Sequence, residues 1–300
     1  MTSTRAIPHL NSTSFDAWLN QLDAFLFDCD GVLWRGDAAI VGAKEAIALL
    51  RARGKKVIFV TNNSTKSRDT YVTKLAGQGI PAVVDDIVTS ASACAAYLKK
   101  TNVQGKVYVV GEAGLATEVS AQGFENFGLQ DNGKTTLPHP FQVDPSVGAV
   151  VIGLDRGISY YKLSYAATCI LQNPGCKFYA TNNDPTYPTD GAILPGGGAC
   201  VAALQTAVGR EPDAIIGKPN QALLQTILST HSLDPSRTCM VGDRLSTDIE
   251  FGRRGGLYTL LVMTGCTSYE EKAAIADEFQ RPDFFVEDVN VLNLLAATST

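Results

Sequence analysis

The chain has 300 residues, of which 45% are hydrophobic, and a formal net charge of −5. This length suits two domains better than one, and the composition is that of a globular protein with a sizeable core. The negative charge disfavours nucleic acid as a partner, and no apolar stretch of about 18 residues predicts a membrane span.

The first part of the chain alternates between apolar runs and amphipathic segments. The run at 23–28 predicts a strand, and 42–54 has helical spacing that ends at a glycine. A second strand follows at 55–63, rich in Val, Ile and Phe, and a second helix at 67–79. Near-continuous apolar strands separated by helices indicate a parallel sheet covered on both faces.

The same alternation continues after residue 100. The strands predicted there are 106–111, 147–153, 176–181, 213–217, 238–243, 257–265 and 283–288, and the helices are 159–172, 198–209, 219–230, 246–254 and 289–297. So many strands exceed one sheet of modest size. We therefore expect two α/β units, one of them inserted within the other.

Polar residues directly follow several of the predicted strands. They are Asp28 and Asp30 after the first strand, Thr61, Asn62 and Asn63 at the end of the second, and Lys218, Asp243 and Asp248 after later ones. In open parallel sheets, ligands bind at the carboxyl ends of the strands. We expect these side chains to face one crevice.

The chemistry of this set indicates phosphoryl transfer. Clustered carboxylates repel each other unless a cation lies between them, and oxygen-only ligands favour Mg²⁺. A hydroxyl, backbone N–H groups and a lysine suit a phosphoryl group. Asp28 can act as a nucleophile that forms an aspartyl-phosphate, and Asp30, on the same side, can protonate the leaving oxygen and then activate water.

The segments DCDGVLW, VTNNS, GKP and GDRLSTD, in this order, resemble the four motifs of the haloacid dehalogenase superfamily of aspartate-dependent phosphatases. The segment 181–204 resembles the loop and helix of a cap inserted between the second and third motifs. This cap marks the p-nitrophenyl, phosphoglycolate and pyridoxal phosphatase branch. The resemblance implies an α/β fold: a Rossmann-like core with a parallel sheet, formed by 1–98 and 207–300, and an inserted α/β cap of the C2 type at 99–206.

The resemblance also implies a role for each matching residue. Asp28 is the expected nucleophile and Asp30 the expected general acid and base. Mg²⁺ is expected on the Asp28 carboxylate, the Asp30 carbonyl and the Asp243 carboxylate, with Asp248 positioning Lys218 or a metal-bound water. Phosphoryl oxygens are expected to contact Lys218 and a loop set formed by Thr61, Asn62 and Asn63.

The predicted activity is the Mg²⁺-dependent hydrolysis of a small phosphorylated metabolite, with 2-phosphoglycolate favoured. A broader 4-nitrophenylphosphatase or a pyridoxal phosphate phosphatase is the alternative. Dehalogenation is disfavoured by Asp30, and a phosphomutase by the size of the insertion. A non-catalytic phospho-ligand sensor is a different class, but a binder gains nothing from a nucleophile crowded by like charge.

Four other features of the sequence suggest roles in substrate selection, packing, anion binding or helix capping. Tyr187, in the predicted cap loop, is a candidate for sorting substrates, whereas Cys29 should pack on the opposite face from Asp28 and Asp30. PGGGAC at 195–200 predicts a turn into a helix whose N–H groups help bind an anion. Ser246 is the expected cap of the helix at 246–254.

Seven scattered cysteines with no C-x-x-C spacing suit reduced thiols inside a cell. The start of the chain shows no secretory signal, but it is rich in Ser and Thr. We expect a cytoplasmic protein, with the plastid stroma as the alternative. The family's caps further imply a homodimer formed through the cap.

Overall fold

The computed structural model describes residues 6–189 and 192–298. The helices are α1 (Ser12–Gln21), α2 (Ala43–Ala52), α3 (Arg68–Gly77), α4 (Ser90–Lys100), α5 (Ala113–Ala121), α6 (Tyr160–Gln172), α7 (Gly197–Val208), α8 (Gln221–His231), α9 (Glu250–Arg254), α10 (Tyr269–Ala273) and α11 (Val291–Thr298). The strands are β1 (Ala24–Phe27), β2 (Trp34–Arg35), β3 (Ala38–Ala39), β4 (Lys56–Thr61), β5 (Ile87–Thr89), β6 (Lys106–Val110), β7 (Asn126–Phe127), β8 (Val147–Ile152), β9 (Lys177–Ala180), β10 (Thr186–Thr189), β11 (Ala192–Pro195), β12 (Ala214–Ile215), β13 (Thr238–Gly242), β14 (Tyr258–Val262) and β15 (Phe284–Val286).

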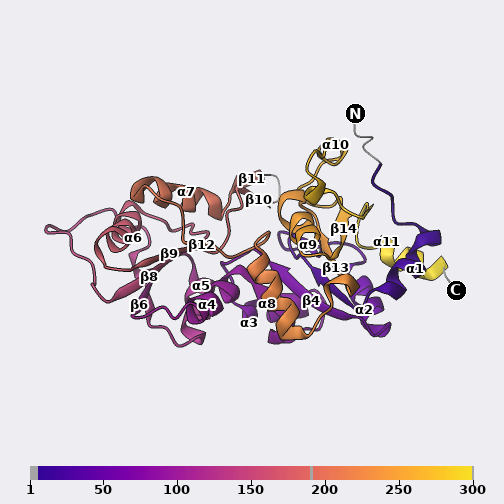
Figure 1. Cartoon of the computed structure of the whole chain (residues 1–300), viewed down its shortest axis with the longest axis horizontal. Coiled ribbons are helices and arrows are strands. Elements are labelled where there is room, and N and C mark those ends of the chain that lie inside the picture. Colours follow the sequence, from indigo (N-terminus) through magenta and orange to yellow (C-terminus); the bar gives the residue numbers. More distant parts are fainter. Residues whose placement is uncertain (1–5, 190–191, 299–300) are drawn as a thin grey trace.

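Two lobes lie side by side along the long axis of the molecule (Figure 1). Within the described residues, one lobe contains a six-stranded sheet in the order β15-β14-β13-β1-β4-β5, and the other a five-stranded sheet in the order β12-β9-β8-β6-β7. The strands within each sheet pair in parallel. The predicted parallel α/β architecture is therefore confirmed.

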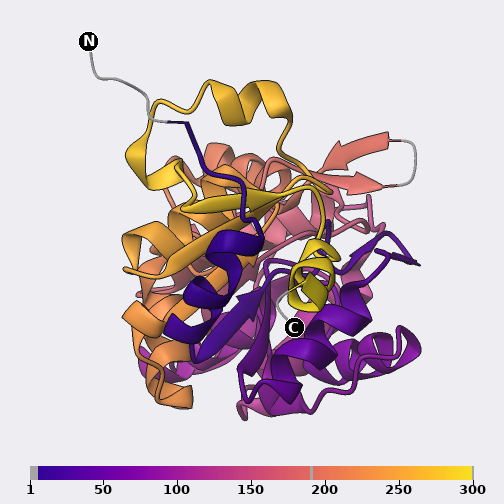
Figure 2. The same cartoon turned by 90° about the vertical axis from the view of Figure 1, so that its right-hand side faces the viewer.

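Alternation along the strands gives the first sheet a core on each face. Phe25 and Phe27 of β1 lie in a cluster with buried residues of α1, α2 and α11, whereas Leu26 packs with residues of α8 and α9. Full burial of such side chains contributes about 1.5–3 kcal/mol each. The helices α1 and α11, from opposite ends of the chain, pack against each other beside this sheet (Figure 2).

The second sheet is also covered on both faces. Tyr108 and Val110 of β6 pack with buried residues of α6 and α7, and Val107 and Val109 pack with those of α4 and α5. None of the helices in the described residues is long and apolar enough to cross a bilayer.

The packing bears on the domain limits predicted at 99 and 206. The helix α4 shares a buried cluster with β6 and α5, and β12 pairs with β9 of the second sheet. Of the strand predicted at 213–217, only Ala214–Ile215 is a strand, and it belongs to the second sheet although it lies within the range 207–300 predicted for the core. We propose a cap that includes α4 and β12.

Three local predictions also need correction. Ser246 lies inside a π-helical turn, Leu245–Ile249, and does not cap the helix. The helix predicted from Pro219 starts at Gln221 behind an Asn220 cap. The expected cap loop contains the β10–β11 hairpin, which stands out from the body of the molecule in Figure 2.

Candidate active site

The carboxyl ends of β4, β1 and β13 meet at one cavity because β1 lies between the other two strands in the sheet. Thr61 is the last residue of β4, Asp28 directly follows β1, and Asp243 directly follows β13. These residues, with Lys218 and with Tyr187 from the other lobe, line a cavity of about 290 Å³. The structure thus brings together the polar residues singled out in the sequence.

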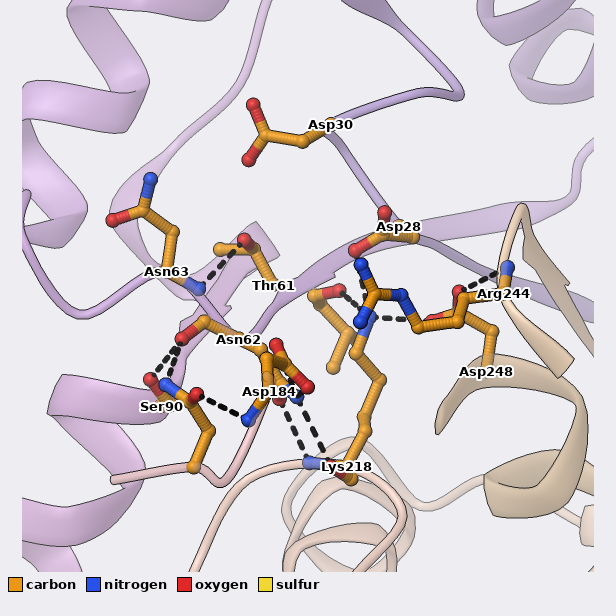
Figure 3. A network of polar contacts seen from close by, with 12 residues as sticks. Asp28, Asp30, Thr61, Asn62, Asn63, Ser90, Asp184, Lys218, Arg244 and Asp248 are labelled. Atoms are coloured by element: carbon orange, nitrogen blue, oxygen red, sulfur yellow. Dashed lines mark hydrogen bonds and ion pairs between the residues drawn. The ribbon is translucent and has the colours of Figure 1, made fainter. Parts of the chain in front are cut away.

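Lys218 is the cation at the base of this cavity. Its Nζ donates to Oδ1 of Asp28 at 2.6 Å, to Oδ1 of Asp248 at 2.7 Å and to the Val60 carbonyl at 2.8 Å (Figure 3). Burial alone would lower the pKa of Lys218, but the charges of Asp248 and Asp28 raise it overall. The ammonium therefore stays charged, and all three of its N–H groups are engaged. A direct bond to a phosphoryl oxygen would have to replace one of these contacts.

Three buried carboxylates cluster at this site, and two of them, Asp28 and Asp248, contact the Lys218 ammonium. Ligand oxygens of Asp28, Asp243 and Asp248 lie within 4.8 Å of one another. Burial and the neighbouring Asp248 charge raise the pKa of Asp243 to about 6. Burial likewise raises the pKa of Asp28, against the opposing charge of Lys218. Such crowding of like charge is relieved when a cation binds among the oxygens.

The backbone around Asp243 is built to hold its carboxylate closely. A Cβ at Gly265 would overlap Oδ2 of Asp243, and a Cβ at Gly31, whose φ is +87°, would crowd the same atom. Oδ2 also accepts a 2.6 Å hydrogen bond from the backbone N–H of Cys266. An all-oxygen donor set in a glycine cradle fits a hard divalent cation such as Mg²⁺.

Asp30 is oriented separately from Asp28. Its Oδ1 accepts a 2.8 Å hydrogen bond from the indole Nε1 of Trp34, which is fully buried. Figure 3 shows the Asp30 carboxylate standing apart from the Lys218 network. Trp34 was not identified from the sequence, although its position four residues after Asp30 could have signalled the contact.

The loop after β4 forms a tight turn that presents its polar groups. The Thr61 hydroxyl accepts a hydrogen bond from the Asn63 backbone N–H at 3.1 Å. The Asn63 side-chain oxygen accepts from the Thr65 backbone at 2.8 Å, which leaves its amide group to face the cavity. These contacts are compatible with the predicted binding of an anion by both residues.

Asn62 joins separate segments of the chain instead. Its Nδ2 donates to the Asp184 carboxylate at 3.2 Å and to the Lys218 carbonyl at 3.0 Å, while its Oδ1 accepts from the Lys218 backbone N–H at 2.8 Å (Figure 3). Its carbonyl accepts from Asn182 and Ser90. Phosphoryl binding through this side chain stays a prediction, and these contacts disfavour it.

The other lobe covers the cavity with the β10–β11 hairpin. Tyr187 of β10 is half-buried and lines the cavity, as expected of a residue that contacts substrate. Arg244 donates through Nη2 to the Thr186 carbonyl at 3.0 Å and so ties this hairpin to the first lobe. Arg244 and Asp184 were missed in the sequence because their partners lie far away along the chain.

Two further expectations concern neighbouring residues. Cys29 is fully buried in the cluster that contains Phe25 and Phe27, so its predicted packing on the opposite face is confirmed. Burial raises the pKa of its thiol well above the usual value. The predicted turn into a helix at 195–200 is also confirmed, because α7 begins at Gly197 and both Gly196 and Gly197 line the cavity.

Comparisons with known proteins agree with this geometry. The family model of haloacid dehalogenase-like hydrolases matches residues 25–125, and a related model matches 215–292. The chain is 41% identical to phosphoglycolate phosphatase 1A of Arabidopsis thaliana, over 97% of this chain and 83% of the relative. It is also 41% identical to the 4-nitrophenylphosphatase of Schizosaccharomyces pombe, over 92% and 94% of the two chains.

A solved structure gives the same result in three dimensions. The glycerol phosphate phosphatase of Mycobacterium tuberculosis, in complex with magnesium, superposes with a TM-score of 0.77 and 34% identity. The match covers 92% of this chain and 77% of that one. On these grounds the chain belongs to the haloacid dehalogenase-like hydrolases.

Proposed function

We propose that this protein is a Mg²⁺-dependent phosphatase that hydrolyses a small phosphate monoester through an aspartyl-phosphate. The observation that carries the proposal is the pairing of the Asp28 carboxylate with Lys218 at 2.6 Å on the wall of the cavity. Lys218 favours the ionised form of a buried carboxylate, which is the form that can attack phosphorus.

The chain's own residues account for both halves of the reaction. An Asp28 oxygen attacks phosphorus, the bond to the ester oxygen breaks, and Asp30 gives its proton to the departing alkoxide. Asp30, now ionised, takes a proton from water, whose oxygen attacks the phosphorus of the aspartyl-phosphate. The phosphorus–Asp28 bond breaks, phosphate leaves, and both carboxyl groups return to their initial states.

The proposed metal ligands are the Asp28 and Asp243 carboxylates and the Asp30 carbonyl. When bound, Mg²⁺ would offset the negative charge that gathers around the transferring phosphoryl group. Asp248 contributes indirectly, because its Oδ1 holds Lys218 at 2.7 Å while its Oδ2 accepts from the Arg244 backbone at 3.1 Å. Thr61 and Asn63 are the proposed donors to the phosphoryl oxygens.

The favoured substrate is 2-phosphoglycolate. The similarity to a phosphoglycolate phosphatase supports it, and a cavity of about 290 Å³ suits a small ester. The alternative is a phosphatase of broader specificity that accepts 4-nitrophenyl phosphate or pyridoxal phosphate. The similarity to the 4-nitrophenylphosphatase of Schizosaccharomyces pombe supports the first of these two substrates.

We also propose a cytoplasmic location, with the plastid stroma as the alternative, and a homodimer formed through the cap.

A phosphate-release assay over about 50 phosphorylated metabolites, ranked by kcat/KM, tests the activity and the substrate together. The Asp28→Asn variant is expected to lose turnover while it still binds phosphate esters. Retained turnover in this variant would exclude Asp28 as nucleophile. If the wild-type protein binds esters but releases no phosphate from any of them, a sensor replaces the phosphatase as the better hypothesis.

A further inference from the structure

The cavity holds more cations than the phosphoryl chemistry uses. The described cations that line it are Lys66, Lys74, Lys218, Arg156 and Arg244. Lys218 is fully engaged by Asp28, Asp248 and Val60, as described above. The guanidinium of Arg244 donates to the Thr186 carbonyl and to Sγ of Cys266, both at 3.0 Å.

The ammonium of Lys74 is also engaged, by a backbone carbonyl and an aromatic ring. Its ammonium donates to the Gly36 carbonyl at 3.1 Å and lies 4.1 Å from the centre of the Trp34 ring. Lys66 differs, because its ammonium forms no hydrogen bond or ion pair with the part of the chain that the structure describes. Lys66 is therefore available to an anion in the cavity.

Arg156, from the other lobe, is held in position yet keeps free donors. Its Nε and Nη2 donate to the two oxygens of Glu112, both at 2.7 Å. A guanidinium has five N–H groups, so three remain, and two of them are on Nη1, which bonds to none of the described residues. The side chain is 66% exposed, so these groups are accessible.

The first turn of α5 connects these two cations. Glu112, the partner of Arg156, immediately precedes α5. Two residues later, Gly114 donates its N–H to the Thr65 carbonyl at 3.1 Å, and a Cβ at this glycine would overlap the Lys66 backbone. The loop that carries Lys66 and the residue that orients Arg156 thus lie against each other, although the two cations come from different lobes.

We propose that Lys66 and Arg156 form a subsite for a second anionic group of the substrate, a carboxylate one or two bonds from the phosphate ester. The inference rests on the proposed phosphatase activity and deepens it, because it selects esters of small hydroxy acids over esters of neutral alcohols. A guanidinium matches the planar fork of a carboxylate, and a lysine adds a point charge.

The subsite is tested by comparing two substrates on the full-length protein with Mg²⁺. One is 2-phosphoglycolate, which carries a carboxylate, and the other is 4-nitrophenyl phosphate, which does not. In Lys66→Met and in Arg156→Met, the ratio of their kcat/KM values is expected to fall roughly ten- to a hundredfold, the range for loss of a charged hydrogen bond. Arg156→Lys retains the charge and should recover part of the ratio.

The control is Lys100→Met, which removes an exposed lysine of α4 outside the cavity and should leave the ratio as in the wild-type protein. Thermal melts of all variants report on folding. An unchanged ratio in either methionine variant, or an equal fall for both esters, would overturn the subsite while the phosphatase activity stands. Absence of phosphate release from both esters by the wild-type protein would instead overturn the proposed function and the subsite with it.

Discussion

The indole Nε1 of Trp34 donates a 2.8 Å hydrogen bond to Oδ1 of Asp30 and so holds the proposed acid and base apart from the Lys218 network. Trp34→Phe keeps most of the buried ring but removes the donor. We expect kcat to fall about tenfold, as for a lost hydrogen bond at the reacting centre, with little change in KM. Steady-state kinetics with 4-nitrophenyl phosphate measures this.

Trp18 offers a matched control for that experiment. It is also buried, but its Nε1 has no hydrogen-bond partner among the described residues. Trp18→Phe should therefore leave kcat at the wild-type value. Equal kcat values for the two variants would show that Trp34 does not position Asp30.

Mg²⁺ should stabilise the folded protein because it binds among three crowded carboxylates that the unfolded chain does not hold together. At 100 times its dissociation constant the gain is about 2.7 kcal/mol, which is a rise in Tm of several degrees. Asp243→Asn should abolish this rise. Without metal, its Tm should equal or exceed that of the wild type, since one buried like charge is gone.

Differential scanning calorimetry with and without Mg²⁺ checks this prediction. Asp234→Asn is the control, because Asp234 caps the short helix 235–237 away from the cavity. It should show the wild-type rise in Tm. A full Mg²⁺-dependent rise in Asp243→Asn would remove Asp243 from the proposed ligands.

Asn62→Ala separates a structural role for this side chain from phosphoryl binding. The substitution leaves the Asp184 carboxylate and the Lys218 backbone N–H without their partner, so we expect a loss of about 2 kcal/mol in the free energy of unfolding. Urea denaturation measures this loss. Unchanged stability together with a raised KM would instead support direct phosphoryl binding by the Asn62 amide.

Tyr187→Ala should change how the enzyme ranks phosphate esters, because Tyr187 of the β10–β11 hairpin lines the cavity. The expected result is an altered ratio of kcat/KM between competing esters in a mixed-substrate assay. Tyr187→Phe keeps the ring and should preserve most of the ranking. If the ranking in Tyr187→Ala matches the wild type, Tyr187 does not sort substrates.

Cys29→Ser tests whether the residue between the two proposed catalytic carboxylates takes part in the chemistry. Cys29 is fully buried among apolar side chains, so a hydroxyl there should destabilise the fold by about 1–3 kcal/mol. At a temperature where the variant is folded, kcat should stay near the wild-type value. A fall in kcat comparable to that of Asp28→Asn would assign Cys29 a chemical role.

Local patterns were enough to predict the proposed catalytic centre. The alternation in β1 separates Cys29 from Asp28 and Asp30, and buried parallel strands must end at a common edge. The same reasoning failed for β12, because a strand of two residues carries too little pattern to show which sheet it joins. The spacing of four residues between Asp30 and Trp34 is visible in the sequence. It was not enough to predict their hydrogen bond, because many tryptophans four residues from an acid make no such contact.

The sequence by itself indicated the longer buried strands, the polar residues at their ends, and hence the chemistry that we propose for this chain. Only the tertiary structure decided which of these residues are free to meet a substrate. Asn62 is bound to Asp184 and Lys218 is saturated by Asp28, Asp248 and Val60, whereas Lys66 and Arg156 keep donors for a ligand. The physical reason is that alternation is a property of neighbouring residues, whereas hydrogen-bond partners between two lobes depend on how their surfaces meet.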